Sequence, residues 1–307
     1  MLYGSPLPVN SFPDLMAMAE KATITVENLR CNKKGLTRLG ALASALQRHR
    51  GKKISIDCTL VSWIDANLAA ALGGLIGQED LLYESKIEFS NLRSDVRDAL
   101  VRTGLLVGKS IDRYGTCIPL TMFGDDEAKD HAAFSTKHLN GRSIPPMTDG
   151  VMQKFFEGID EIFNNSTIHS KSIFKILVCG QIYPGKKLID YTIVDLGVGF
   201  KEAIDKHLDD DISPCAAIEW AMKENNTTRG LDMPGGLGLG ILKDFVVLNR
   251  GRLTIFSDHG YWCLSGVGVE MEDLKTRFPG TFVNLEINTA DKSHYYLKQE
   301  LDPNKLL

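Results

Sequence analysis

The chain has 307 residues, of which 43% are hydrophobic and 24% charged, so it is long enough for two domains with buried cores. Its net charge of -4 argues against a nucleic-acid partner, which would need a basic surface. The longest apolar run, Leu68 to Ile76, is too short to cross a bilayer, and no signal peptide is expected at the start. The six cysteines form no CxxC pair, which is typical of reduced thiols, so we expect a cytoplasmic protein.

Predicted strands and helices alternate in the amino-terminal part of the chain, which favours an α/β sandwich. Residues 1–21 contain three prolines and are interpreted as an arm. The strands are predicted at Ala22 to Leu29, Lys53 to Asp57, Ile87 to Phe89 and Thr116 to Met122. The helices are predicted at Leu36 to Arg50, within Leu60 to Ile76 after the turn VSWIDAN, and at Arg93 to Val101.

The segment ISIDCTLVSWIDANLAAALGGLI, followed by IEFSNL and VRDALVRTGLL, resembles a STAS domain over residues 22–122. This is the fold of anti-sigma-factor antagonists and of sulfate-transporter tails. The antagonists usually carry a phosphorylatable Ser or Thr at the helix start, where this chain has Asp65-Ala66-Asn67 and no hydroxyl. The resemblance therefore implies a docking or dimerising module, and a domain that only completes the fold is the alternative.

Residues 123–147 are predicted to link two domains. The stretch GDDEAKDH is acidic, GRSIPPMTDG is rich in turn residues, and we place the boundary at Ile144-Pro145-Pro146 because consecutive prolines exclude a helix. The second domain then covers residues 148–290 and begins with a helix that Thr148 or Asp149 can cap, and residues 291–307 form a charged tail of undetermined structure.

That helix is predicted to carry one apolar and one polar face. Its apolar stripe consists of Val151, Phe155, Ile159, Ile162 and Phe163. Glu161, Asn165 and His169 stand four residues apart, so a carboxylate, an amide and an imidazole lie above one another on a second face. A solvated surface row is the alternative interpretation of these three residues.

The rest of the second domain mixes strands, glycine turns and short helices. A hairpin is predicted from Ile173 to Ile182 and Leu188 to Val194, and a final strand at Thr281 to Ile287. Lys201 to His207, the segment starting at Ser213-Pro214, and Leu239 to Leu248 are predicted helices, and Asp209-Asp210-Asp211 is a solvated charge run. We also expect a mobile lid at Asn225 to Met233 and a hairpin of Arg252 to Ser257 with Gly260 to Leu264 around Asp258-His259.

Four elements in order resemble the ATP-binding boxes of the GHKL superfamily, which includes gyrase, chaperones, histidine kinases and MutL. Glu161 and Asn165 match the first box, and Asp195, Gly197 and Gly199 match an Asp-x-Gly-x-Gly loop. The last two elements are a Gly-x-Gly-Leu helix start at Gly236, Gly238 and Leu239, and a closing Gly280-Thr281. The resemblance implies a two-layer α/β sandwich of the GHKL (Bergerat) type that binds ATP and Mg²⁺.

Each box has a chemical role in such a site. Backbone N–H groups at the glycine-rich helix start suit a triphosphate in an acidic protein. The amide oxygen of Asn165 suits Mg²⁺ together with phosphate oxygens, and Glu161 is the candidate catalytic base for the attacking water. Asp195 can accept a hydrogen bond from the adenine amino group, and an Asx turn is its local alternative.

Two further residues have weaker roles. Thr281 can donate its hydroxyl to a phosphate, but strand propensity explains it equally well. His169 matches a His that follows the Asn in the anti-sigma-factor kinase branch, although a lone helical His is more often a packing or surface residue.

Three functions fit this pattern. The first is a Mg-dependent ATP hydrolase whose nucleotide state regulates a protein partner, either a STAS-like protein or a second copy of the chain in a homodimer. The second is a serine/threonine kinase of the anti-sigma-factor type that acts on a STAS-like partner. The third is a non-catalytic, nucleotide-gated interaction protein. Bacterial signalling is suggested by analogy of fold alone.

Overall fold

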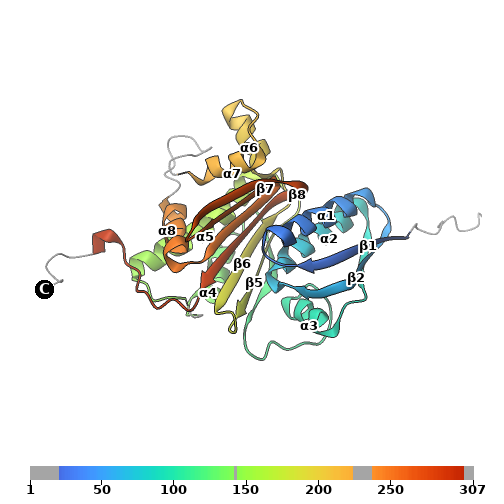
Figure 1. The fold of residues 1–307 in the computed structure, drawn as a ribbon, viewed down its shortest axis with the longest axis horizontal. Coiled ribbons are helices and arrows are strands. Elements are labelled where there is room, and N and C mark those ends of the chain that lie inside the picture. The colour runs from blue at the N-terminus through green and yellow to red at the C-terminus, as the bar shows by residue number, and fades with distance from the viewer. Residues whose placement is uncertain (1–20, 142–143, 224–236, 301–307) are drawn as a thin grey trace, which may run out of the picture.

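The computed structural model describes residues 21–141, 144–223 and 237–300, and its strands form two separate sheets (Figure 1). The first sheet has three parallel strands in the order β1-β2-β3, with bounds β1 Lys21–Leu29, β2 Lys53–Ile64 and β3 Lys86–Ser90. The second has five antiparallel strands in the order β4-β5-β6-β8-β7, with bounds β4 Cys117–Phe123, β5 Ile176–Tyr183, β6 Leu188–Asp195, β7 Arg252–Ser265 and β8 Gly268–Asn288. The fold is therefore of the mixed α/β class, as the sequence predicts.

The helices divide between the two faces of the second sheet. Those that follow the first strands are α1 Lys33–Arg48, the short 3-10 helix η1 Ala66–Leu68, α2 Ala69–Tyr83 and α3 Ser94–Thr103. Those of the carboxy-terminal part are α4 Ala128–Leu139, α5 Asp149–His169, α6 Gly199–Leu208, α7 Pro214–Met222, α8 Leu237–Asn249 and the 3-10 helix η2 Lys298–Glu300. None of the helices in the described ranges is long and apolar enough to cross a membrane.

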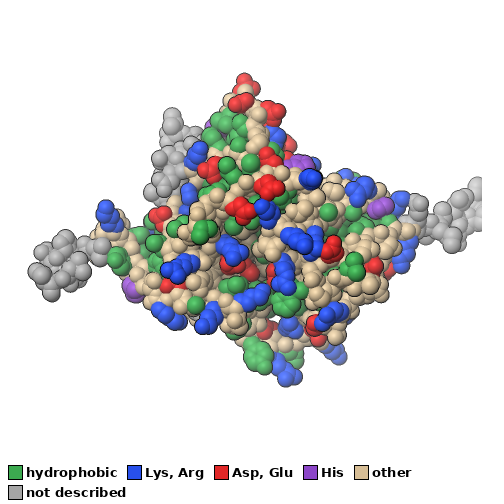
Figure 2. Space-filling model, in the orientation of Figure 1, with side chains coloured by type: hydrophobic (Ala, Val, Ile, Leu, Met, Phe, Trp, Pro, Cys, Tyr) green, Lys and Arg blue, Asp and Glu red, His purple; other side chains and the backbone are tan. Residues whose placement is uncertain are grey.

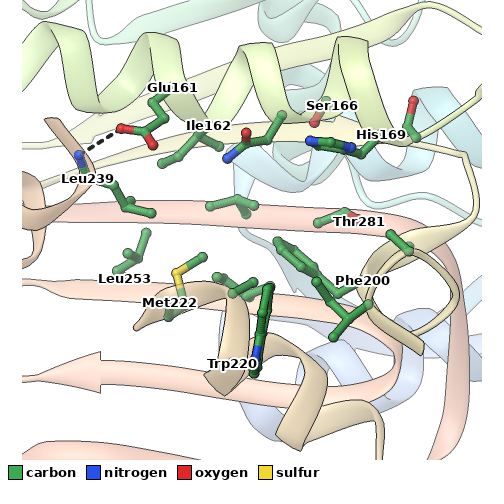
Figure 3. Close-up of a pocket in the computed structure, with 18 of the residues that line it drawn as sticks. Glu161, Ile162, Ser166, His169, Phe200, Trp220, Met222, Leu239, Leu253 and Thr281 are labelled. Carbon is green, nitrogen blue, oxygen red and sulfur yellow. Dashed lines mark hydrogen bonds between the residues drawn. The ribbon is translucent and has the colours of Figure 1, made fainter. Parts of the chain in front are cut away.

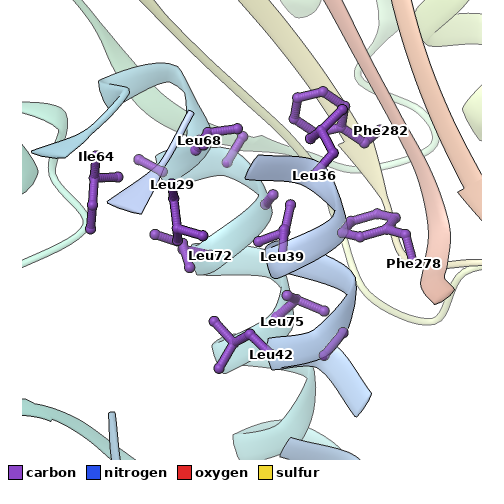
Figure 4. Packing of buried hydrophobic residues seen from close by; sticks show 14 of the residues in the cluster. Leu29, Leu36, Leu39, Leu42, Ile64, Leu68, Leu72, Leu75, Phe278 and Phe282 are labelled. Carbon is purple, nitrogen blue, oxygen red and sulfur yellow. The ribbon is translucent and has the colours of Figure 1, made fainter. Parts of the chain in front are cut away.

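The helices α1 and α2 lie between the two sheets and pack against both. Leucines of the two helices, such as Leu39 and Leu72, are buried in one apolar cluster with residues of β1 and β2 (Figure 4). Phe278 and Phe282 of β8 belong to the same cluster, so one core joins the first sheet, the helix pair and the near face of the second sheet. The opposite face of the second sheet is covered by α5, α7 and α8, whose apolar side chains form a second cluster.

Buried polar residues also connect the amino-terminal unit to the second sheet. Asn67 of η1 is fully buried, and its Nδ2 donates to Thr192 Oγ1 at 2.9 Å and to Asn284 Oδ1 at 3.0 Å. Asn284 Nδ2 in turn donates to Asp190 Oδ1 at 2.8 Å. Asn67 is thus part of an internal polar joint between the amino-terminal unit and the second sheet.

Several elements differ from the sequence predictions. The strand expected at Lys53 to Asp57 continues to Ile64, so the first half of the predicted turn VSWIDAN belongs to β2. The strand expected at Thr116 to Met122 is present as β4, but it pairs with β5 and so belongs to the second sheet, before the proline pair at residues 145–146. The expected linker contains α4, which the sequence analysis missed because its buried stripe is partly polar, at His131, Ser135 and Leu139. The expected hairpin around Asp258-His259 is one strand, β7; its register shifts there, and the actual turn lies at Ser265 and Gly268.

The charged surface is uneven on the face shown in Figure 2. Acidic side chains gather on the projecting end that carries α6 and α7, whereas Lys and Arg side chains lie mainly over the middle and lower parts of this view. The predicted charge run Asp209-Asp210-Asp211 belongs to this projecting end and is exposed. The local charge therefore differs between parts of the surface, and the net charge of the whole chain does not show this difference.

Asp190 gives a pH-dependent stability prediction. Burial raises the pKa of its carboxyl to about 7, and the neighbouring Glu286 and Asp65 carboxylates also raise it, against the amide donor of Asn284. A carboxyl with a raised pKa in the folded state favours folding at low pH and loses this contribution as pH rises through 7. Asp190→Asn keeps an acceptor for Asn284, and we expect it to increase the free energy of unfolding at pH 8 by on the order of 3 kcal/mol.

Urea unfolding at pH 8, 6 and 4 measures this difference, which should shrink towards pH 4. Asp98→Asn, on the exposed side of α3, is the control and should change stability little at any of these pH values. A less stable Asp190→Asn variant at pH 8 would show that the ionised carboxylate is needed in the joint.

Candidate functional site

The polar row of α5 faces a cavity and does not lie on the open surface. Thr148 caps the helix, since its Oγ1 accepts a hydrogen bond from Val151 N, as predicted. The predicted apolar stripe is buried against the second sheet. Glu161, Asn165 and His169 all line the cavity, and Glu161 and His169 are labelled in Figure 3.

The cavity lies between α5, the second sheet and the helices that follow β6. Its volume is about 1180 Å³, a value that includes the solvent at its open side. The floor is apolar and comes from the sheet, with Leu253, Ile255 and Val283. Phe200 of α6 together with Trp220 and Met222 of α7 line it on the side opposite α5 (Figure 3).

Asp195 lines the cavity and is the last residue of β6. Its strand neighbour in β8 is Thr281, so the antiparallel register brings the first residue of one predicted motif beside the last residue of another. The side chain is 2% exposed, and its Oδ1 accepts a hydrogen bond from Gly197 N at 3.0 Å. The hydroxyls of Ser166 and Thr281 also interact with this carboxyl.

The environment of Asp195 leaves its charge adjustable near neutral pH. Burial raises the pKa of this carboxyl to about 6, while the hydrogen bonds from Gly197, Ser166 and Thr281 lower it and so limit the rise. The carboxylate is therefore mostly ionised at pH 7.5 and mostly protonated at pH 5. An ionised, buried acceptor at the end of a cavity can receive an N–H group of a ligand.

The loop glycines are required for close contacts within the protein. A Cβ on Gly197 would lie 1.9 Å from Ser170 O, at the end of α5, and Gly197 is not among the residues that line the cavity. Gly199 does line it and has φ of +75°, and Gly280 has φ of +126° with its Cα facing Asp195 O. Side chains other than hydrogen would thus push the loop away from α5 and β8.

The start of α8 contacts the polar row of α5. Leu239 N donates a hydrogen bond to Glu161 Oε2 at 3.1 Å, so a carboxylate already interacts with the positive end of the helix (Figure 3). Lys243, one turn later, donates from Nζ to Met222 O at 2.5 Å and ties α8 to α7. Gly238 lies in the first turn of α8, while Gly236 and the predicted lid at residues 225–233 lie outside the described residues.

The sequence analysis missed the apolar wall and one polar neighbour. Phe200 follows a predicted glycine turn, and Trp220 belongs to the predicted Ser213-capped helix, but nothing in their spacing shows that they face α5. Ser166 follows Asn165 directly, and its interaction with Asp195 depends on the packing of α5 on β6. The position of a residue in a helix predicts the helix face on which it lies, but only the tertiary packing decides which residues that face contacts.

A metal ion would find few protein ligands here. Across the described ranges, no group of three or more His, Cys, Asp or Glu side chains is arranged to hold one. Asn165 and Glu161 supply two oxygen donors one helical turn apart on the cavity wall.

Gly197 gives a stability prediction for the loop. We expect Gly197→Ala to lower the free energy of unfolding by about 1–3 kcal/mol or more, because its Cβ would overlap the backbone of Ser170. Gly185→Ala is the control, since nothing lies within 4 Å of a Cβ added there. Both values are measured by urea unfolding, and equal effects of the two substitutions would show that the loop does not depend on this contact.

Comparisons with known proteins assign no family. No family model matches the chain, and no curated protein matches it by sequence. The functional argument therefore depends on the geometry of the cavity and on the residues that line it.

Proposed function

We propose that this chain binds an adenine nucleotide with Mg²⁺ in the cavity beside α5 and hydrolyses ATP, as members of the GHKL superfamily do. One observation supports this most strongly. Glu161, Asn165, Asp195, Leu239 and Thr281 come from four elements far apart in sequence, and all five line one cavity. These residues were chosen from the sequence because they match ATP-binding boxes. A chance match would not be expected to place all five around one cavity.

The base fits the inner end of the cavity. The adenine amino group would donate to the Asp195 carboxylate, and the apolar side chains of Ile162 and Val283 would contact the faces of the ring. Guanine has a carbonyl oxygen in place of this amino group, and a buried carboxylate repels it. Asp195 would therefore select adenine. The ionised Asp195 carboxylate lowers the stability of the fold, and recognition of the base would be the reason that it is kept.

The phosphates fit the opposite end, at the start of α8. Backbone N–H groups and the helix dipole favour an anion there, and Glu161 already occupies the N–H of Leu239. A terminal phosphate that takes over this N–H would release the Glu161 carboxylate. The freed carboxylate can then orient and deprotonate the attacking water.

Mg²⁺, when bound, would neutralise charge that develops on the phosphate oxygens. Asn165 is the residue that would hold it through its amide oxygen, one turn of α5 beyond Glu161. His169 lies one further turn along the same wall, near Thr281 in the view of Figure 3, where it would contact the nucleotide.

The kinase alternative needs a separate acceptor protein. The stretch that resembles the helix start of STAS antagonists, Asp65-Ala66-Asn67, has no hydroxyl, and its Asn67 is fully buried in the joint with the second sheet. We therefore do not propose this stretch as the phosphoacceptor. A separate STAS-like protein, or a second copy of the chain, remains the proposed partner whose binding the nucleotide state would control.

Calorimetric titration with an unhydrolysable ATP analogue and Mg²⁺ tests the binding step. We expect saturable uptake by the wild type, and Asp195→Asn should weaken it by about 10- to 100-fold, since a hydrogen bond to a charged group contributes about 1.5–3 kcal/mol. Asn165→Ala should weaken it as well. Asn164→Ala, at the adjacent position outside the cavity lining, is the matched control.

The pH dependence of the same titration is a second readout. Wild-type affinity should fall as pH drops from 7.5 to 5, because protonation of Asp195 removes the acceptor, and Asp195→Asn should lose this dependence. Uptake by the wild type that is unaffected by both cavity substitutions would place the nucleotide elsewhere, and no uptake would contradict the proposed function.

Glu161→Gln separates hydrolysis from binding. We expect phosphate release to fall about 100- to 10,000-fold, as for the loss of a general base, while nucleotide affinity stays equal or rises because a competing negative charge leaves the start of α8. Glu157→Gln, one turn earlier on α5 and paired with Lys154, is the control. Labelled phosphate on a partner would favour the kinase, and ATP retention with neither activity would favour the non-catalytic function.

A further inference from the structure

The amino-terminal unit touches the loop that carries Asp195. Gln78 of α2 donates from Nε2 to Leu196 O at 3.1 Å, across 118 positions of the sequence. Leu196 is 5% exposed and belongs to the apolar cluster between the sheets. Gly74, one turn before Gln78, packs directly on it, since a Cβ there would lie 3.2 Å from Leu196 Cδ1. Both the backbone and the side chain of Leu196 are thus held by α2.

The contact bears on Asp195 through a single peptide group. The carbonyl of Leu196 and the N–H of Gly197 belong to the same planar unit, so the orientation of one fixes the orientation of the other. Gln78 holds the carbonyl end, and the N–H end donates to Asp195 Oδ1 at 3.0 Å. A hydrogen bond to the carbonyl also polarises the N–H and strengthens its bond to the carboxylate.

This peptide group is held between two rigid supports. On the side of the cavity, Gly197 packs against the end of α5, and Val198 N donates to Ser170 O at 2.8 Å. On the opposite side, Gly77 of α2 packs on the ring of Phe174 in the segment between α5 and β5. A displacement of α2 would therefore change the direction of the Gly197 N–H and, with it, the position of the carboxylate.

We propose that Gln78 is a positioning residue through which the amino-terminal unit controls recognition of the base by Asp195. This inference rests on the proposed function and adds a regulatory role for the amino-terminal unit. Gln78 does not line the cavity, so it would act through Leu196 and Gly197. Because coupling between two sites is reciprocal, a nucleotide in the cavity stabilises α2 by the same free energy by which an ordered α2 strengthens nucleotide binding.

Base selectivity is the readout that separates positioning from simple structural support. Gln78→Met keeps the length of the side chain but has no donor, and Gln78→Lys restores a donor on an unbranched chain. By calorimetry with Mg²⁺, we expect Gln78→Met to weaken ADP binding about 3- to 10-fold and to leave GDP binding unchanged, so that the ADP/GDP affinity ratio falls. Gln78→Lys should recover the ratio, and Gln153→Met on the outer side of α5 should not change it.

Hydrogen–deuterium exchange on the full chain gives an independent measurement. Saturation with ADP should slow exchange in α2 of the wild type, and this slowing should be lost in Gln78→Met. The inference would be overturned if Gln78→Met weakened ADP and GDP binding equally, or if ADP did not alter exchange in α2 of the wild type. In either case, ADP uptake by the wild type would still support the proposed function. Absence of ADP uptake by the wild type would refute both.

Discussion

The pairing of β6 with β8 is the constraint on which the rest of the structure depends. Side chains alternate between the two faces of a strand, so the register decides which residues meet the cavity and which meet the amino-terminal unit. With Asp195 opposite Thr281, both residues face α5. With Thr192 opposite Asn284, both face Asn67 of the amino-terminal unit. A slip by one residue would exchange the two sets and destroy both the cavity and the joint.

This arrangement buries a carboxylate on each face of the same strand. Burial raises the pKa of both Asp190 and Asp195, so each costs stability when it ionises. The two differ in what surrounds them. Asp190 is enclosed by the joint with Asn284, whereas Asp195 borders a cavity that is open to solvent on one side. A bound N–H donor would offset the desolvation of Asp195, and the second sheet, covered on both faces, keeps the residue in place until a ligand arrives.

Much of the site follows from local patterns in the sequence. The apolar stripe of α5, its Thr148 cap and the Ser213-Pro214 start of α7 are recognisable because each depends on neighbours in the chain. The position of β4 in the second sheet, the partly polar inner face of α4 and the contact of Gln78 with Leu196 depend on elements far away in sequence. Periodicity carries no information on such contacts, and so the direct connection between α2 and the Asp195 loop became visible only in the fold.

A crystal structure of the full chain with ADP and Mg²⁺ tests the central claim most directly, because it shows both the place and the orientation of the base. The account predicts the adenine amino group within about 3 Å of the Asp195 carboxylate, a usual hydrogen-bond distance, with the diphosphate directed towards the start of α8. ADP bound outside this cavity, or inside it with the base directed away from Asp195, would contradict the account.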